Sequence, residues 1–176
     1  MCFAALFLLM GQGNFCVAQV ETYRIDKNQS SVAFEVTHLG VLKVNGQFQD
    51  FSGMFVFVEE KLTQIESKID VESIDTEDKS RNESLVDEGY LNAKEHPFIH
   101  FKSISVKDNV ITGLLTIKEV EKNIEFPFHL KKKKDFFQIT ISTMVSRKGF
   151  NLDFGAMDAL VGDEIRIELK IVNLPN

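Results

Sequence analysis

The sequence predicts a single all-β domain whose strands pair antiparallel and close into a barrel or a sandwich. Apolar residues recur at every second position over most of the chain, the segments between these runs are short, and only one segment resembles a helix. Such a sheet has one apolar face, and with so little helix the sheet itself must cover that face. We therefore expect eight or nine strands around a common interior.

The strands follow from the alternation. It is strict in 65–72, 124–130 and 164–171, where aliphatic or aromatic residues alternate with charged and polar ones. Six further segments are strand-like but less regular: 23–25, 31–39, 42–58, 98–106, 110–117 and 136–145. Short polar or glycine turns separate them, at 27–28, 40, 107–109 and the basic run 131–134, and they favour hairpins over helical crossovers.

Two segments interrupt the strand pattern. Ser80 and Glu83 have the spacing of a capping box, which predicts a helix of about two turns near 81–88 that ends at Gly89. The segment 149–162 is expected to be a loop with a helical turn. No repeat or linker divides the chain, so residues 19–176 form one domain.

Composition and the N-terminus narrow the function classes. The chain of 176 residues is 44% apolar with a net charge of −6, which argues against a nucleic-acid surface. Residues 1–18 contain an apolar run and small residues before a cleavage point at Ala18, which predicts a secretory signal; a buried N-terminal helix or strand is the alternative. Cys2 and Cys16 both fall in this segment, so the mature chain would lack disulfides and thiol chemistry, and no transmembrane segment is expected in it.

Residue patterns for catalysis or metal binding are weak. His96 and His100 have a metal-pair spacing, but Pro97 argues against a shared helix and no third ligand is evident nearby. The acidic residues around 75–88 match no calcium loop and suit a solvated helix face. Phosphate loops and hydrolase motifs are absent, so we expect neither a cofactor nor an enzyme.

The interior decides the function. Eight strands leave room either for a filled core or for one elongated ligand, and composition favours neither. The predicted ligand-binding residues are the inward-facing positions together with His38 and Arg147: Phe34, Val36, His38, Val44, Phe48, Phe55, Phe57, Ile69, Val71, Phe101, Leu115, Ile117, Phe126, Phe128, Arg147, Ile167 and Leu169. Val32 also faces inward.

Several segments together resemble a known family. They are 23–26, 31–40, 44–48, 51–53, 73–76, Arg81, Leu85, the run from His96 to Ser103, 112–117 and 161–165. In this order, across the mature chain, they are similar to the YceI family of secreted bacterial lipid-binding proteins. Glu119, where glycine is common in the family, and the segment 147–151 depart from the pattern.

The resemblance implies a lipocalin-like antiparallel barrel, a long apolar interior, a bound isoprenoid or other long-chain lipid, and a periplasmic or secreted location. For a phosphate head group, Arg147 and Lys148 are the first expected partners and Arg81 the second; pairing of these cations with local carboxylates is the competing reading. Two other functions stay open: a filled barrel acting as a stress-response or protein-interaction module, and an enzyme on isoprenoid lipids that uses His38, His100 or Arg147. A homodimer also stays open.

Overall fold

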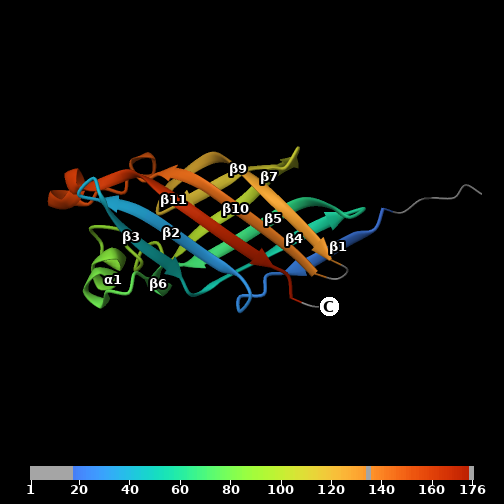
Figure 1. Ribbon diagram of the computed structural model, residues 1–176, viewed down its shortest axis with the longest axis horizontal. Coiled ribbons are helices and arrows are strands. Elements are labelled where there is room, and N and C mark those ends of the chain that lie inside the picture. Colours follow the sequence, from blue (N-terminus) through green and yellow to red (C-terminus); the bar gives the residue numbers. More distant parts are fainter. Residues whose placement is uncertain (1–17, 134–135, 175–176) are drawn as a thin grey trace, which may run out of the picture.

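The protein is one curled antiparallel sheet, as the computed structural model of residues 18–133 and 136–174 shows (Figure 1). The strands are β1 (Val20–Arg24), β2 (Ser31–His38), β3 (Leu42–Phe48), β4 (Phe51–Val58), β5 (Lys61–Asp70), β6 (Ile74–Asp75), β7 (Phe98–Lys107), β8 (Val110–Ile117), β9 (Val120–Lys133), β10 (Phe136–Ser146) and β11 (Val161–Val172). Their order in the sheet is β1-β4-β5-β7-β8-β9-β10-β11-β2-β3-β6.

The sheet curls until strands far apart in this order meet. Ile25, just after β1, forms an isolated bridge with Asn173, just after β11. Two backbone hydrogen bonds flank the bridge, from Asp26 N to Val172 O at 2.8 Å and from Leu174 N to Arg24 O at 2.9 Å. The predicted all-β antiparallel barrel is thereby confirmed as a fold class.

The predicted number of strands is wrong, for two local reasons. The segment 42–58 is two strands, because the chain turns at Gln49 and Asp50 and continues as β4, which pairs with β1 and β5, whereas β3 pairs with β2 and β6. The short strand β6 adds the eleventh, and its two residues pair with Phe48 and Gln47 of β3. The basic run predicted as a turn also differs, since β9 continues through Lys133; Lys134 lies outside the described residues.

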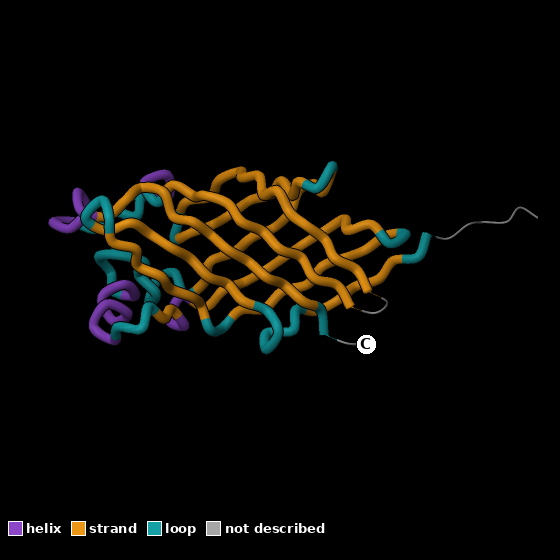
Figure 2. Tube along the Cα trace, in the orientation of Figure 1, coloured by secondary structure: helices purple, strands orange, loops and turns teal. Residues whose placement is uncertain are grey.

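The helical segments gather at one end of the barrel, to the left in Figure 2. They are α1 (Lys79–Val86) and the 3-10 turns η1 (Val71–Ser73), η2 (Lys148–Phe150) and η3 (Gly155–Leu160). The predicted capping box is wrong: the Asp78 carboxylate, and not the Ser80 hydroxyl, caps the helix and accepts from the Arg81 amide at 3.0 Å. Ser80 lies inside the helix, the Glu83 carboxylate lies 3.7 Å from Lys79 Nζ, and the helix ends at Val86, before Gly89. The loop predicted at 149–162 contains η3, as expected.

Two expectations concern the N-terminus and membranes. The predicted signal segment and both cysteines precede residue 18 and lie outside the described residues. In the described part of the chain, no helix has both the length and the apolar character needed to cross a membrane.

Candidate functional site

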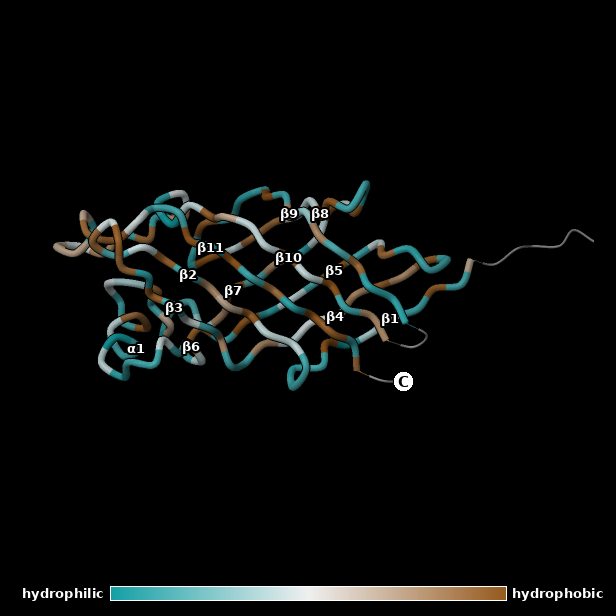
Figure 3. The backbone as a smooth tube through the Cα atoms, in the orientation of Figure 1, coloured by the Kyte–Doolittle hydropathy of each residue, from teal (hydrophilic) through white to brown (hydrophobic). Residues whose placement is uncertain are grey.

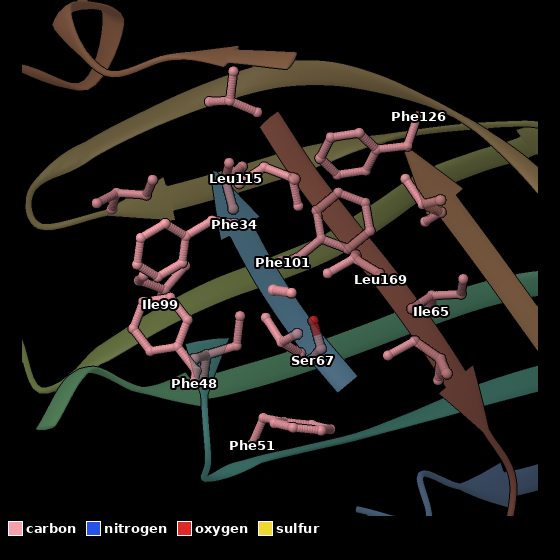
Figure 4. Close-up of a pocket in the computed structure, with 18 of the residues that line it drawn as sticks. Phe34, Phe48, Phe51, Ile65, Ser67, Ile99, Phe101, Leu115, Phe126 and Leu169 are labelled. Carbon is pink, nitrogen blue, oxygen red and sulfur yellow. The ribbon is translucent and has the colours of Figure 1, made fainter. Parts of the chain in front are cut away.

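The half of the barrel nearest to the helical end is hollow. An inner chamber of about 150 Å³ lies between the walls, and apart from Ser67 and Arg147 every residue that lines it is apolar. Figure 4 shows the labelled side chains of Phe101, Leu115 and Leu169 converging on this space, with the Ser67 hydroxyl as the oxygen in view. Because side chains alternate along each strand, every second side chain points inward. Strands on opposite walls of the barrel therefore contribute to the lining.

The other half of the barrel is filled. Tyr23, Phe55, Phe57 and Phe137 pack there, with ring centroids 4.4 Å apart for Phe57 and Phe137 and 4.8 Å apart for Tyr23 and Phe137. Phe55, Phe57 and Phe137 are at most 1% exposed. This aromatic plug closes the inner chamber at one end, because Phe55 belongs to both the plug and the lining. The barrel therefore combines the two alternatives that composition leaves open.

An outer chamber of about 460 Å³ continues the cavity toward the helical end. It shares seven lining residues with the inner chamber: Phe34, Phe48, Ile99, Ile117, Leu152, Ile165 and Ile167. Its outer part is more polar, with Thr76, Asp78, Ser80, Arg81 and Ser84 on or beside α1. One continuous cavity thus changes from apolar at depth to polar at its mouth.

Phe34 lies at the junction of the two chambers and depends on a glycine. It pairs with Gly46 across β2 and β3, and its ring covers the glycine so closely that a Cβ at position 46 would lie 2.3 Å from the Phe34 Cζ. Any side chain at position 46 would push the ring away. Gly46 therefore fixes where the Phe34 ring stands between the chambers.

The structure brings most of the predicted site residues to this cavity. Fourteen of the seventeen line one or both chambers: Phe34, Val36, His38, Val44, Phe48, Phe55, Ile69, Phe101, Leu115, Ile117, Phe126, Arg147, Ile167 and Leu169. The other three line neither chamber. Phe57 is in the aromatic plug, Phe128 is in the same buried cluster, and Val71 is buried in a second cluster with Leu91 and Phe150.

Sequence reasoning missed several lining residues. Ile139 and Ile141 of β10 alternate with polar neighbours, so the same period-two signal could have identified them. Tyr90, Phe154 and Met157 line the outer chamber from loops or turns, where no periodic signal exists. Their places depend on how the loops fold over the mouth.

Arg147 does not offer its charge to the cavity, contrary to its predicted role as the first head-group partner. Its side chain is 0% exposed, and all five of its N–H groups are used. They donate to the Asp158 carboxylate and to the backbone oxygens of Leu152, Asp158, Val161 and Gly162. The guanidinium also lies over the Phe154 ring, 4.9 Å from its centroid. Arg147 thus forms an ion pair with a local carboxylate, which was the alternative to a head-group role. Its hydrogen bonds attach the loop that contains η3 to the barrel.

The same contacts set the charge of the neighbouring carboxylates. The hydrogen bond from the Arg147 side chain, helped by the Phe154 amide and the nearby cations, lowers the pKa of Asp158 below its ordinary value. The Lys148 amide and the Ser146 hydroxyl lower the pKa of Asp163 in the same way. Both groups are therefore ionised at neutral pH and hold this loop through charge-assisted hydrogen bonds.

Acid is expected to weaken this loop through Asp158. A carboxylate with a lowered pKa in the folded state stabilises the fold above its unfolded pKa, and the contribution is lost as the pH falls through the folded value. We expect Asp158→Asn to lower the thermal midpoint at neutral pH, and the gap to wild type to narrow below about pH 4. Asp108→Asn, the same change in an exposed turn, is the control. A gap that is constant from pH 6 to about pH 2.5 would contradict the assignment.

Arg81 is the cation that faces the mouth. Its Nε donates to the Thr76 hydroxyl and its Nη2 to the Thr76 carbonyl, both at 2.8 Å. Within the described chain Nη1 has no hydrogen-bond partner, and the residue lines the outer chamber. The arginine is thus positioned by the chain before α1 and keeps donor capacity for another group.

The histidines do not form a metal site with other residues of the described chain. His96 Nε2 lies 3.4 Å from a Glu119 carboxylate oxygen, and His100 is exposed beside the Phe98 ring on the outside of β7. His38 lines the outer chamber, and no other histidine of the described residues does. Within the described residues, no three His, Cys, Asp or Glu side chains are grouped so that they could hold a metal ion.

Comparison with known sequences places this geometry in a family. The YceI-like domain matches residues 23–173. A UPF0312 protein of Pseudomonas aeruginosa is 32% identical over 127 residues, which are 66% of this chain and 66% of that protein. Protein YceI of Escherichia coli is 34% identical over 130 residues, 69% of this chain and 65% of that protein. The alignments thus span about two thirds of these relatives' own lengths, and the resemblance seen in the sequence is confirmed.

Solved structures share the fold. BcnA of Burkholderia cenocepacia superposes with a TM-score of 0.77 at 25% identity, covering 84% of this chain and 98% of that one. A polyisoprenoid-binding domain of Saccharophagus degradans has a TM-score of 0.73 at 11% identity, covering 88% and 98%. A YceI protein of Campylobacter jejuni has a TM-score of 0.69 at 23% identity, covering 80% and 90%.

Proposed function

This chain belongs to the YceI-like family, and on that premise we propose that it is a periplasmic or secreted carrier of an isoprenoid-like or other long-chain lipid. The observation that carries the proposal is the continuous cavity, whose inner chamber is apolar except for Ser67 and Arg147. A hydrocarbon chain leaves water on entering such a space. Burying a few hundred square ångströms of chain at about 25 cal/mol per Å² contributes about 5 to 10 kcal/mol, from which the cost of association is subtracted.

The polarity gradient orients the lipid. Its chain would occupy the inner chamber and point toward the aromatic plug, while its head group would stay in the outer chamber near α1. An anionic head would find Arg81, whose Nη1 is unbonded within the described chain, whereas Arg147 is saturated by its own loop. The resemblance to a polyisoprenoid-binding domain supports an isoprenoid chain, although that likeness by itself is one of fold.

We infer that the protein carries its lipid without transforming it. Among the described residues, no His, Asp or Glu lines the inner chamber, and the Ser67 hydroxyl therefore has no general base beside it there. His38 reaches only the outer chamber and His100 lies on the outside of the barrel. The enzyme alternative would thus have to use His38 in the outer chamber, where Asp78 also belongs to the lining.

Native mass spectrometry combined with organic extraction tests this function. Protein purified from its own host is expected to release a long-chain lipid, and the stripped protein to take up a dansyl-labelled prenol. An Arg81→Gln variant should retain the neutral prenol but lose about tenfold in affinity for the corresponding prenyl phosphate, the cost of one charged hydrogen bond. Lys79→Gln, which removes a cation exposed on the same helix, is the control. Recovery of no lipid together with no uptake of the prenol would contradict the carrier function.

A further inference from the structure

Five exposed apolar residues form a rim at the hollow end of the barrel. Leu39 and Val41 come from the turn between β2 and β3, Leu42 is the first residue of β3, and Met157 and Leu160 come from η3. We call these five residues the apolar rim. Val41 is 80% exposed and the others between 37% and 55%. The two segments touch, because the Leu39 amide donates to the Leu160 carbonyl at 2.7 Å and His38 pairs with Val161. Figure 3 shows hydrophobic colouring in both loops at this end.

The chemistry of the apolar rim differs from that of the other tight turns. Leu39 and Gly40 have positive φ angles, as do residues of the turns after β4, β7 and β8. Those other positive-φ positions carry Glu59 and Glu60, Asp108 and Asn109, and Lys118, which are residues that water solvates well. The same backbone geometry therefore carries charge or an amide elsewhere and leucine here. Clustered exposed apolar residues of this kind mark an interaction surface rather than an ordinary loop.

Charge is nearly absent from the rim segments. Residues 39–42 contain none, and residues 154–162 contain only Asp158, whose carboxylate is turned toward Arg147 and lies 3.5 Å from Lys148 Nζ. Lys43, at the base of the hairpin, is paired with Glu35 at 2.9 Å. What covers the rim must therefore be apolar, and electrostatic attraction contributes little to it.

The apolar rim is continuous with the mouth of the cavity. Met157 belongs to the rim and also lines the outer chamber, and His38 and Val161, which join the two rim segments, line it as well. On the other side of the mouth α1 brings Ser80 and Arg81, so that this side is polar. In Figure 1, η3 (orange-red) and α1 lie at the same end of the barrel, with η3 above α1. A lipid that enters the cavity therefore passes between the apolar rim on one side of the mouth and the polar side chains of α1 on the other.

From this arrangement we propose that the apolar rim inserts into the surface of a lipid bilayer, so that a lipid passes between the bilayer and the cavity without crossing water. The inference rests on the proposed carrier function. A bilayer is the partner that fits, because it is apolar just below its surface, needs no complementary charge, and supplies the molecule that the adjoining cavity would take. The head group of that molecule would stay on the side of α1, at the level of the bilayer's own head groups.

The test separates membrane binding from lipid binding. The full mature chain is mixed with vesicles of phosphatidylcholine, with or without phosphatidylglycerol, and floated on a density gradient. Wild type is expected to float with both kinds of vesicle alike and with little dependence on salt. A Val41→Asp/Leu42→Asp double variant, which changes two rim residues that line neither chamber, should reduce the bound fraction by about tenfold, because a carboxylate does not enter the bilayer interface. Ile104→Asp, which charges a 63%-exposed apolar residue on the wall strand β7, is the control and should float as wild type does.

Uptake of a dansyl-labelled prenol gives the second measurement. Uptake from phosphatidylcholine vesicles should slow about tenfold in the double variant, whereas uptake from a dilute vesicle-free dispersion should be unchanged. Floating of the double variant like wild type, or no floating of wild type, would overturn the proposal. Chemical cross-linking in the host is the check for a protein partner. The proposal would also be overturned, in favour of such a partner, if wild type is cross-linked to another protein, the double variant is not, and both bind vesicles equally. If the prenol is not bound even from dispersion, the carrier function fails, and the rim is judged by flotation alone.

Discussion

Replacing Leu115 by tryptophan is expected to lower the affinity for a long-chain lipid by about thirty-fold. Leu115 points into the inner chamber from β8, opposite Phe101 on the neighbouring strand (Figure 4). The larger side chain would occupy the space of about two and a half methylene groups, and each buried methylene contributes about 0.8 kcal/mol, so that about 2 kcal/mol of binding free energy is lost. Titration of the stripped protein with a dansyl-labelled prenol measures the change.

The neighbouring residue provides a matched control. Leu114 is on the same strand but faces the outside of the barrel, beside Lys102 and Thr116. Leu114→Trp therefore adds the same side chain one position away and should leave the affinity unchanged. The thermal midpoint of Leu115→Trp should not fall by more than that of the control, since the new ring fills a cavity rather than a packed core. Equal affinities for both variants would show that the lipid chain does not reach the inner chamber.

Replacing Arg147 by methionine is expected to reduce the free energy of unfolding by about 3 kcal/mol, since it removes one partner of a buried ion pair. The change leaves the Asp158 carboxylate without its main partner and removes the arginine donor from four backbone oxygens. Methionine keeps most of the side-chain volume, so the loss measures polar contacts rather than packing. Chemical denaturation gives the free energy, and hydrogen exchange at residues 152–162 shows whether the loop with η3 is the part that opens.

Lys148→Met is the control for Arg147→Met. Lys148 also pairs with Asp158, at 3.5 Å, but its side chain is 59% exposed, so the expected loss is below about 1 kcal/mol. A head-group role for Arg147 makes the opposite forecast: a stable Arg147→Met protein that loses affinity for prenyl phosphate and not for prenol. That result would restore the role expected from the sequence and remove the one assigned to the loop.

Alternation of apolar and polar residues was a reliable guide to the strands and to the face that each residue takes. The runs 65–72, 124–130 and 164–171 all fall mainly in strands, and fourteen of the residues selected from the sequence line the cavity. The fold class and the family could be predicted because both depend on local patterns and on their order. The predicted helix cap was wrong, because Asp and Ser are both favourable N-cap residues and the local sequence does not show whether Asp78 or Ser80 takes that position.

The site could be predicted less well than the walls that form it. Phe57 and Phe101 both face inward by the same period, yet Phe57 stacks on Phe137 in the plug and Phe101 lines the void. Arg147 and Arg81 are both cations near the mouth. Only the path of the folded loop determines that every N–H group of the Arg147 side chain donates to that loop. The contributions of Tyr90 and Met157 also come from loops whose paths no period describes.

By itself the sequence determined that the sheet is antiparallel, which face of each strand is apolar, and to which family the chain belongs. Only the tertiary structure decided that one half of the interior is filled and the other hollow, that the mouth has an apolar and a polar side, and which arginine faces it. The physical reason is that side-chain direction follows from the two-residue period of a strand, whereas the width of a cavity depends on the distance between opposite walls. That distance is set by the curl of the whole sheet and by the size of side chains that are far apart in sequence, such as Phe101 of β7 and Leu169 of β11.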